Sequence, residues 1–403
     1  MPSQAVLVFI DQAIFSGTNF LLMLFLAQKL DIKSFGIFST LFLIAYLGMS
    51  VTNALIIQPF QVSHFKVLNK KEYFVFLFLG LLCLLLFFNM LIELLFVFLP
   101  ILKGYSLYSK AIVCFVSGLL IQDFFRKFFL GFTQILNVLL IDSLFLILIV
   151  ILFYFFKDDI QLTNTLWIIG ISNLVSSISG LYFIFKNYEK PLSWKLFLQN
   201  HLSQGKWLFY SAFLQWSSSN FFVLVSGIYL GIEALGALRL VQSVFGVLNV
   251  ALISIENYVL PRVVFLYNES AAKAKKYLVK ISLFGVLFLG VLLLPLFIFS
   301  NEIIILAGGI KYQEYGYVIK IMAILYFFIF MNYPIRIAIK VLVLNKIFFY
   351  GYVISFIFSV ASFHFFLKYF GLYGAVLGLA INQLVMFLYW KHQLNKSQFK
   401  LWI

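Results

Sequence analysis

Long apolar runs recur from one end of this sequence to the other, with few charged residues inside them. Hydrophobic residues make up 64% of the chain and charged residues 11%. A water-soluble globular protein needs polar residues over its surface, and this chain has too few to cover one. The sequence therefore predicts a membrane protein, because lipid is the solvent that tolerates so much exposed apolar surface.

The length and number of the apolar runs indicate how often the chain crosses the membrane. A spanning helix takes about 20 apolar residues, and these runs are far longer than the ~10 alternating residues of a membrane β-strand. We therefore predict an all-α polytopic membrane protein, whose backbone polar groups are satisfied inside each helix. The twelve expected transmembrane helices cover about residues 5–27, 37–57, 73–99, 111–130, 135–156, 163–185, 207–230, 237–260, 278–300, 316–338, 347–367 and 371–390.

The basic residues predict the orientation. Twelve spans place both termini on one side, and most of the 29 lysines and arginines fall in the connections on that side. The positive-inside rule therefore places both termini in the cytoplasm. The net charge of +15 follows from this topology, with some attraction to anionic membrane lipids, and it requires no nucleic acid. Nine basic residues fall on the opposite side: Lys29, Lys33, Lys103, Lys110, Lys157, Arg239, Lys311, Lys320 and Lys368.

A polar stretch near the midpoint, residues 186–206, predicts a linker between two halves. It contains Pro191 and Gly205, which are typical of connections. The expected domains are an N-terminal six-helix lobe over residues 1–190, a cytoplasmic linker over 191–205 and a C-terminal six-helix lobe over 206–403.

The two halves also resemble each other in sequence. LDIKSFGIF at residues 30–38 aligns with LGIEALGAL at 230–238, and SGTNF at 16–20 lies opposite SSSNF at 217–221. Several matches in order indicate a duplication. Because each half has an even number of spans, both halves share one orientation, related by an axis along the membrane normal. This layout favours two lobes around a central cavity and transport by alternating access.

Polar side chains inside the spans are candidates for lining such a cavity, because they are costly in lipid. They concentrate in the first, second, seventh and eighth expected helices. Such residues either join helices through hydrogen bonds or line a shared polar cleft, and their recurrence in both halves favours the cleft. The candidate substrate-binding residues are Gln12, Asn19, Asn53, Gln215, Asn220, Gln242, Arg239 and Lys29.

Charged residues within the spans allow more than one role. Arg239, near the outer end of the eighth span, either extends to the interface or clamps a phosphate or carboxylate group. Lys29 is a weaker candidate for the same role. Asp11 and Glu256 either carry a coupling H⁺ or Na⁺, or pair with Arg262 or another nearby cation. A structural role between helices is expected for Glu93, Asp123, Arg126, Lys127 and Asp142.

Motifs for bound cofactors are missing from the sequence. The four histidines form no pair at metal-ligand spacing, and there is no GxxxxGK[ST] nucleotide-binding motif. We expect no catalytic residue, no metal and no cofactor. The energy source is then an ion gradient, the membrane potential or the substrate gradient.

Three segments resemble bacterial polysaccharide flippases of the Wzx type, in the multidrug/oligosaccharidyl-lipid/polysaccharide exporter (MOP) superfamily. These are DQAIFSGTNFLLMLFLAQKLDIKSFGIFS at 11–39, NALIIQP at 53–59 and QDFFRKFFLG at 122–131. Elsewhere the resemblance is architectural: twelve spans, two lobes and a cytoplasmic linker. It implies a carrier of undecaprenyl-diphosphate-linked oligosaccharide from the inner to the outer leaflet of the bacterial cytoplasmic (inner) membrane, for surface polysaccharide such as O-antigen.

The resemblance also implies partners and a cationic cavity. The implied partners are the lipid-linked oligosaccharide, membrane lipids, a polysaccharide polymerase and glycosyltransferases. The family's cavity is rich in cations, whereas Arg239 and Lys29 are the basic residues that this sequence supplies near the four polar helices.

Other functions stay open on the sequence. An ion-coupled drug or small-molecule exporter of the same superfamily would need cavity carboxylates and hydrophobic walls. A membrane glycan polymerase or transferase would need catalytic groups on a large outer loop, but the longest outer connection, residues 300–316, carries just Glu302, Lys311 and Glu314 as charges. We therefore predict a transporter and no enzyme, and a scaffold without transport activity is less consistent with the duplicated polar stripes.

Overall fold

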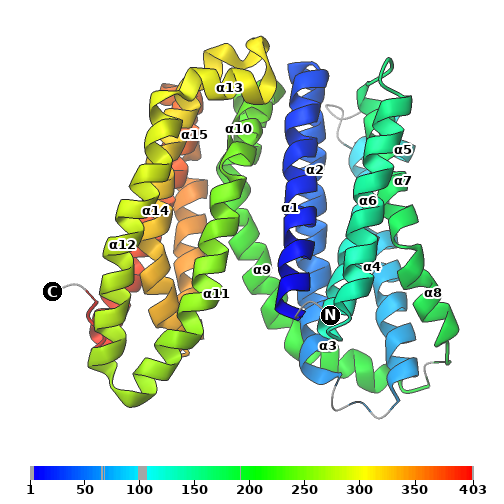
Figure 1. Ribbon diagram of the computed structural model, residues 1–403, viewed down its shortest axis with the longest axis horizontal. Coiled ribbons are helices and arrows are strands. Elements are labelled where there is room, and N and C mark those ends of the chain that lie inside the picture. Colours follow the sequence, from blue (N-terminus) through cyan, green and yellow to red (C-terminus); the bar gives the residue numbers. More distant parts are fainter. Residues whose placement is uncertain (1–3, 65–66, 68, 99–106, 191, 402–403) are drawn as a thin grey trace. The chain divides into compact units, whose positions relative to one another are not determined.

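The computed structural model describes residues 4–64, 67, 69–98, 107–190 and 192–401, and within these ranges the chain is helical with no strand. Pro191 of the expected linker and residue 99 of the third expected span lie outside this part. The helices (Figure 1) are α1 (Gln4–Lys29), α2 (Ile32–Thr52), η1 (Asn53–Ile57), α3 (Gln58–Ser63), α4 (Lys70–Phe98), α5 (Ser109–Gly131), α6 (Ile135–Phe155), α7 (Leu162–Ser176), α8 (Ile178–Lys186), α9 (Trp194–Leu230), α10 (Ile232–Val244), α11 (Gly246–Glu269), α12 (Ala271–Ile298), α13 (Ser300–Gly308), η3 (Ile310–Tyr315), α14 (Gly316–Val341) and α15 (Asn345–Lys396).

These helices confirm the prediction of an all-α polytopic membrane protein. Nine helical stretches of the described chain are long and apolar enough to cross a membrane. The last two expected spans form the single long helix α15, whose backbone breaks at Gly371 with φ of 55°. Glycine tolerates this left-handed conformation at no steric cost, so the chain turns there. The more polar α5 and α9 cover expected spans as well.

The chain folds into two compact units. Unit 1 holds the chain up to Asn19 and Thr40–Phe213, and unit 2 holds Phe20–Ser39 and the chain from Leu214 onward. The lobes expected at 1–190 and 206–403 stay a prediction.

The core of unit 1 forms where α5 packs against α6 and α7 (Figure 1). Gly118 of α5 and Gly170 of α7 allow the two backbones to meet, because a Cβ atom at Gly118 would overlap the Gly170 carbonyl oxygen. Close approach through small residues is how helices pack in lipid, where no hydrophobic effect drives them together.

The core of unit 2 forms where α14 packs against α11, α12 and α15. Trp390 of α15 is fully buried and stacks on Phe348, with ring centroids 5.5 Å apart. Its indole N–H donates to the carbonyl oxygen of Ile347 (3.1 Å), so this buried polar group is satisfied.

The turn between α1 and α2 belongs to unit 2 and is bound to α13 and η3. The Gln28 side chain donates to the carbonyl oxygen of Leu306 (2.8 Å). Lys311 donates to the carbonyl oxygens of Gln28 (3.0 Å) and Leu30. A lysine at the last carbonyl groups of a helix is favourable, because it satisfies them and lies at the negative end of the helix dipole.

Two glycines related by the internal repeat meet in unit 2. Helices α2 and α10 begin at Ile32 and Ile232, two hundred positions apart. A Cβ atom at Gly36 would overlap the carbonyl oxygen of Ile232, and one at Gly236 would lie 3.0 Å from the Cα atom of Gly36 and 3.2 Å from the carbonyl oxygen of Ile32. The contact is reciprocal, so a local twofold relation joins the two repeats here.

A second repeat-related pair of turns has no matching sequence. The α5–α6 and α14–α15 connections place Thr133 (φ 57°) and Val343 (φ 54°) in the left-handed conformation. Thr133 N–H donates to Leu130 and Val343 N–H to Lys340, at 3.0 and 3.1 Å, with equivalent bonds at the residues that follow. Both turns therefore close the preceding helix in the same way.

Candidate functional site

The structure distributes the predicted substrate-binding residues over both units. Lys29, Gln12 and Gln215 have exposed side chains, and the other five are half-buried. Three lie in unit 1 (Gln12, Asn19 and Asn53), and five lie in unit 2 (Lys29, Gln215, Asn220, Arg239 and Gln242). The shared cavity that would unite them stays a prediction.

Two of these residues, Asn19 and Asn220, are repeat-related and make the same local bond. The amide of Asn19 donates to the carbonyl oxygen of Phe15, and that of Asn220 to the carbonyl oxygen of Trp216, each at 2.9 Å. Each asparagine therefore uses one donor to brace its own helix. Such bonds fix the rotamer, so the carboxamide oxygen is held in one direction.

Arg239 and Gln242 come together one turn apart on α10. The Arg239 guanidinium donates to Oε1 of Gln242 (2.9 Å). Tyr326 of α14 lies close enough to Arg239 and to the Asn249 side chain to interact with both. The result is a half-buried cation held in place by an amide, which suits recognition of an oxyanion.

Other polar groups join α9 to α15 and join the two parts of α15 on either side of Gly371. The Ser218 and Ser355 hydroxyls lie 2.6 Å apart, and the amide of Asn382 donates to Ser359 Oγ (2.6 Å). All four side chains are buried. For Ser218, on the polar stripe of α9, interhelical bonding is therefore the observed role.

Asp11 forms a buried cluster with residues to which the sequence assigns a structural role between helices. Arg126 of α5 donates from Nη2 to Asp11 of α1 (3.2 Å) and from Nε to Asp142 of α6 (2.7 Å). All three side chains are at most 7% exposed. The Arg126 guanidinium also lies 3.6 Å above the Phe15 ring, which adds a cation–π contact. Of the alternatives for Asp11, pairing with another nearby cation is what the structure shows.

The charges in this cluster do not balance. Two carboxylates share one guanidinium, and Oδ1 of both Asp11 and Asp142 is buried without a hydrogen-bond partner. The two carboxyl groups interact directly as well. Two carboxylates this close rarely ionise together in an apolar environment, so a shared proton or a small cation would complete the set.

The charge balance at Glu256 is the opposite of that at Asp11, because one carboxylate here faces two cations. It pairs with Lys340 (2.5 Å) and Arg336 (3.6 Å) of α14. The alternative of pairing with Arg262 is not what the structure shows: the Arg262 guanidinium lies 5.4 Å from the Phe265 ring, on the same helix. Arg336 lies 210 positions after Arg126, at the same place before the repeated turn, so each unit has an arginine there, buried at Arg126 and half-buried at Arg336.

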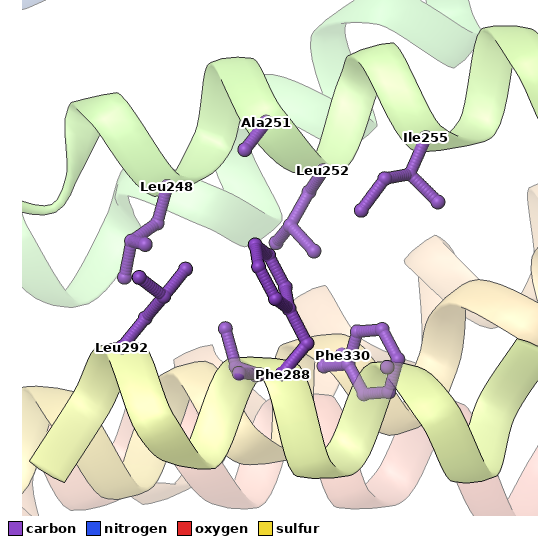
Figure 2. A pocket seen from close by; sticks show the side chains of 9 residues that line it. Leu248, Ala251, Leu252, Ile255, Phe288, Leu292 and Phe330 are labelled. Carbon is purple, nitrogen blue, oxygen red and sulfur yellow. The ribbon is translucent and has the colours of Figure 1, made fainter.

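Unit 2 also contains an apolar hollow in its membrane-spanning part (Figure 2). Leu248, Leu252 and Ile255 of α11 face Phe288 and Leu292 of α12, and Phe330 of α14 lies beside them. Every other residue that lines it is also apolar. The side chains that line the hollow therefore offer no group to bind a sugar, phosphate or ion.

Metal ligands do not gather in the described ranges of the chain, where no group of three or more His, Cys, Asp or Glu residues is placed to hold a metal ion.

Comparisons with known proteins find solved structures with a similar fold. No protein-family model and no curated protein sequence matches this chain. Among solved structures, it is similar to a lipid II flippase MurJ in an inward closed conformation, with a TM-score of 0.76 over 97% of this chain and 87% of that one. It is also similar to an inward-facing multidrug resistance MATE family transporter of the MOP superfamily, with a TM-score of 0.69 over 99% and 96% of the two chains. Sequence identity is 13% in both. The chain thus has the fold of MOP-superfamily transporters.

Proposed function

We propose that this protein is a flippase that moves undecaprenyl-diphosphate-linked oligosaccharide from the inner to the outer leaflet of the bacterial cytoplasmic membrane by alternating access. The observation that carries the proposal is the likeness of nearly the whole chain to a lipid II flippase. Arg239 and its amide partner Gln242 add a half-buried cation that suits a diphosphate. Both termini lie in the cytoplasm in this proposal, and the polymerase and glycosyltransferases of surface polysaccharide synthesis are its partners.

The physical problem that such a carrier solves is desolvation. A diphosphate sugar head group cannot enter hydrocarbon without partners for its charges and hydroxyls. The polar residues of α1, α2, α9 and α10 would replace water for the head group, while the lipid tail stays in the bilayer. An inside-negative potential favours outward movement of an anion by about 2.3 kcal/mol per charge per 100 mV, so export of the diphosphate has a built-in driving force.

Substitution of Arg239 tests the proposal. In a deletion strain complemented with Arg239→Ala, we expect export to be lost and lipid-linked oligosaccharide to accumulate in the inner leaflet, because the substituted side chain cannot bind phosphate. Surface glycan and leaflet distribution of the lipid-linked precursor are measured, with immunoblotting of the membrane fraction. The matched control is Lys368→Ala, which removes an exposed cation outside the proposed site and should leave export unchanged. Normal surface glycan with Arg239→Ala would remove Arg239 from the mechanism.

The cluster of Asp11, Arg126 and Asp142 suits the coupling of an ion to transport. We infer that Asp11 holds the coupling H⁺ or Na⁺ together with Asp142, because their charges exceed that of Arg126. Glu256, the other candidate, already faces two cations and is less suited to bind a third.

Asp142→Asn should separate the coupling role from the structural one. The substitution leaves one carboxylate beside one guanidinium, so we expect a thermal unfolding midpoint close to that of the wild type and a loss of dependence on a pH or Na⁺ gradient. Transport into proteoliposomes with and without an imposed gradient measures this. A gradient dependence that survives the substitution would show that the cluster is purely structural.

The second candidate function is an ion-coupled drug or small-molecule exporter. Two observations favour it: the buried carboxylates of the Asp11 cluster and the likeness to a multidrug resistance MATE transporter. The two functions differ in a simple readout. A deletion strain that becomes sensitive to cationic drugs, and that keeps its surface glycan, supports the exporter.

A further inference from the structure

The first turns of α9, which belong to the expected linker, are bound tightly to unit 1. Phe197, His201 and Gly205 follow one another at intervals of four and therefore share one helix face. All three are buried. The Phe197 ring lies 5.0 Å from Tyr73 and 5.5 Å from Phe76 of α4. The helical part of the expected linker thus packs against unit 1.

This face of α9 meets an irregular turn in the second span. Residues Asn53–Ile57 form a π-helix between α2 and α3, and the Gln58 N–H donates to the carbonyl oxygen of Asn53, five residues earlier. Pro59 explains part of this geometry. Proline has no N–H to donate to the carbonyl oxygen of Leu55 four residues earlier, and its ring crowds that oxygen.

His201 supplies the missing donor. Its Nδ1 lies 3.0 Å from the carbonyl oxygen of Leu55, and its Nε2 lies 2.7 Å from the Tyr73 hydroxyl. A carbonyl oxygen only accepts, so Nδ1 carries the proton and Nε2 accepts from Tyr73 in the neutral ring. Burial lowers the pKa of His201, which favours that neutral form.

Gly205 brings the α9 backbone against the same turn. A Cβ atom there would lie 3.4 Å from both the Ala54 carbonyl oxygen and the Leu55 Cα atom. The repeat-related Pro261 offers a comparison, because it lies inside α11 without a π-turn. Proline alone is therefore insufficient, and the π-turn occurs where the linker helix contacts the span.

We propose that His201 is a positioning residue: together with Gly205 it holds this π-turn and so sets the direction in which Asn53 faces the substrate. A π-turn is an α-helix with one residue inserted. Each residue of an α-helix adds about 100° of rotation, so the residues after the turn face a direction about 100° away from the one that their sequence positions would give in a regular helix. The inference rests on the proposed function, in which Asn53 binds substrate.

Deletion of Leu55 is the direct test. Removing one residue turns the π-turn into an α-turn and keeps the register of each flanking helix, so the protein should reach the membrane and unfold near the wild-type temperature. Export of lipid-linked oligosaccharide should fall to background, because Asn53 lies inside the turn itself and its side chain changes direction when the turn becomes regular α-helix. As a matched control, deletion of Leu47 in the regular part of α2 should prevent folding. Normal export by a stable Leu55-deleted protein would overturn the proposal.

Chemical labelling gives a readout that does not depend on transport. With Cys83 and Cys114 replaced by serine, the rate of maleimide reaction at Asn53→Cys is compared between His201 and His201→Ala backgrounds. We expect a several-fold change at position 53 and no change at the control Gln12→Cys on α1. Tyr73→Phe, which keeps the His201 bond to Leu55, should change the rate less.

The outcomes distinguish the two proposals. Equal labelling rates with His201 and His201→Ala would overturn the positioning role, whatever the substrate. If His201→Ala does not accumulate, His201→Gln keeps a side-chain N–H donor and serves as the second variant, with the expectation of near wild-type labelling. Absence of export by the wild-type protein in proteoliposomes, with labelling that responds to His201, would refute the flippase and leave the π-turn assignment intact.

Discussion

Arg126→Met is expected to destabilise the protein by about 3–5 kcal/mol, the cost of leaving buried charges without their partner. The substitution keeps most of the side-chain volume but removes the guanidinium that Asp11 and Asp142 share. Both carboxyl groups are nearly inaccessible to solvent, so water cannot take its place. Chemical unfolding in detergent micelles measures the loss, and the amount of protein in the membrane fraction should fall with it.

Two further variants isolate the electrostatic cause. Arg126→Met combined with Asp11→Asn and Asp142→Asn removes every charge of the cluster, so most of the stability should return. The neighbouring Lys127→Met breaks a pair with Asp123 in which the lysine is 30% exposed, and it should cost no more than about 1 kcal/mol. A triple variant as unstable as Arg126→Met would mean that Arg126 acts through packing.

Gly36→Ala and Gly236→Ala are expected to open the contact between the repeats. The added methyl groups collide with backbone atoms of the opposing repeat, which cannot rotate away, so each substitution should destabilise unit 2 by about 1–3 kcal/mol. The turn between α1 and α2 then separates from α10. Trypsin cleavage at Lys29 and Lys33 should therefore become faster, and export should be lost in the double variant.

Gly17→Ala on α1 is the matched control. No heavy atom lies within 4 Å of a Cβ atom there, and alanine forms helix better than glycine by up to about 1 kcal/mol. Stability should be unchanged or increased, opposite in sign to the effect at Gly36. Equal changes in stability at the three glycines would show that helix propensity determines the change, rather than the contact between the repeats.

The fold could be predicted from the sequence because lipid imposes a strong rule: each spanning segment must be one long apolar helix. All twelve expected segments coincide with helix in the described residues. Local departures were not predictable in the same way. The π-turn at Asn53–Ile57 is in contact with His201, nearly 150 positions away. The C-terminal end of α1 belongs to unit 2, where it contacts Leu306 and Lys311.

The residue types of the candidate site could be predicted from the sequence, but the hydrogen-bond and ion-pair partners of these residues could be predicted less well. Polar stripes point to α1, α2, α9 and α10, and the Arg239–Gln242 pair joins two of the predicted residues. For Asp11, the sequence allows pairing with Arg262 or another nearby cation, and the partner in the structure is Arg126. The sequence predicts a structural role between helices for Arg126, in the QDFFRKFFLG segment. It does not predict the partner of Arg126, because a sequence alone does not show which helices are neighbours in space.

The turns at Thr133 and Val343 have the same main-chain conformation. Their hydrogen bonds match, while the residues that form them do not. The main chain therefore follows the same path at these two corners although the side chains differ. Proteins that share this fold are accordingly recognisable by shape at a sequence identity as low as the 13% found with the two solved structures.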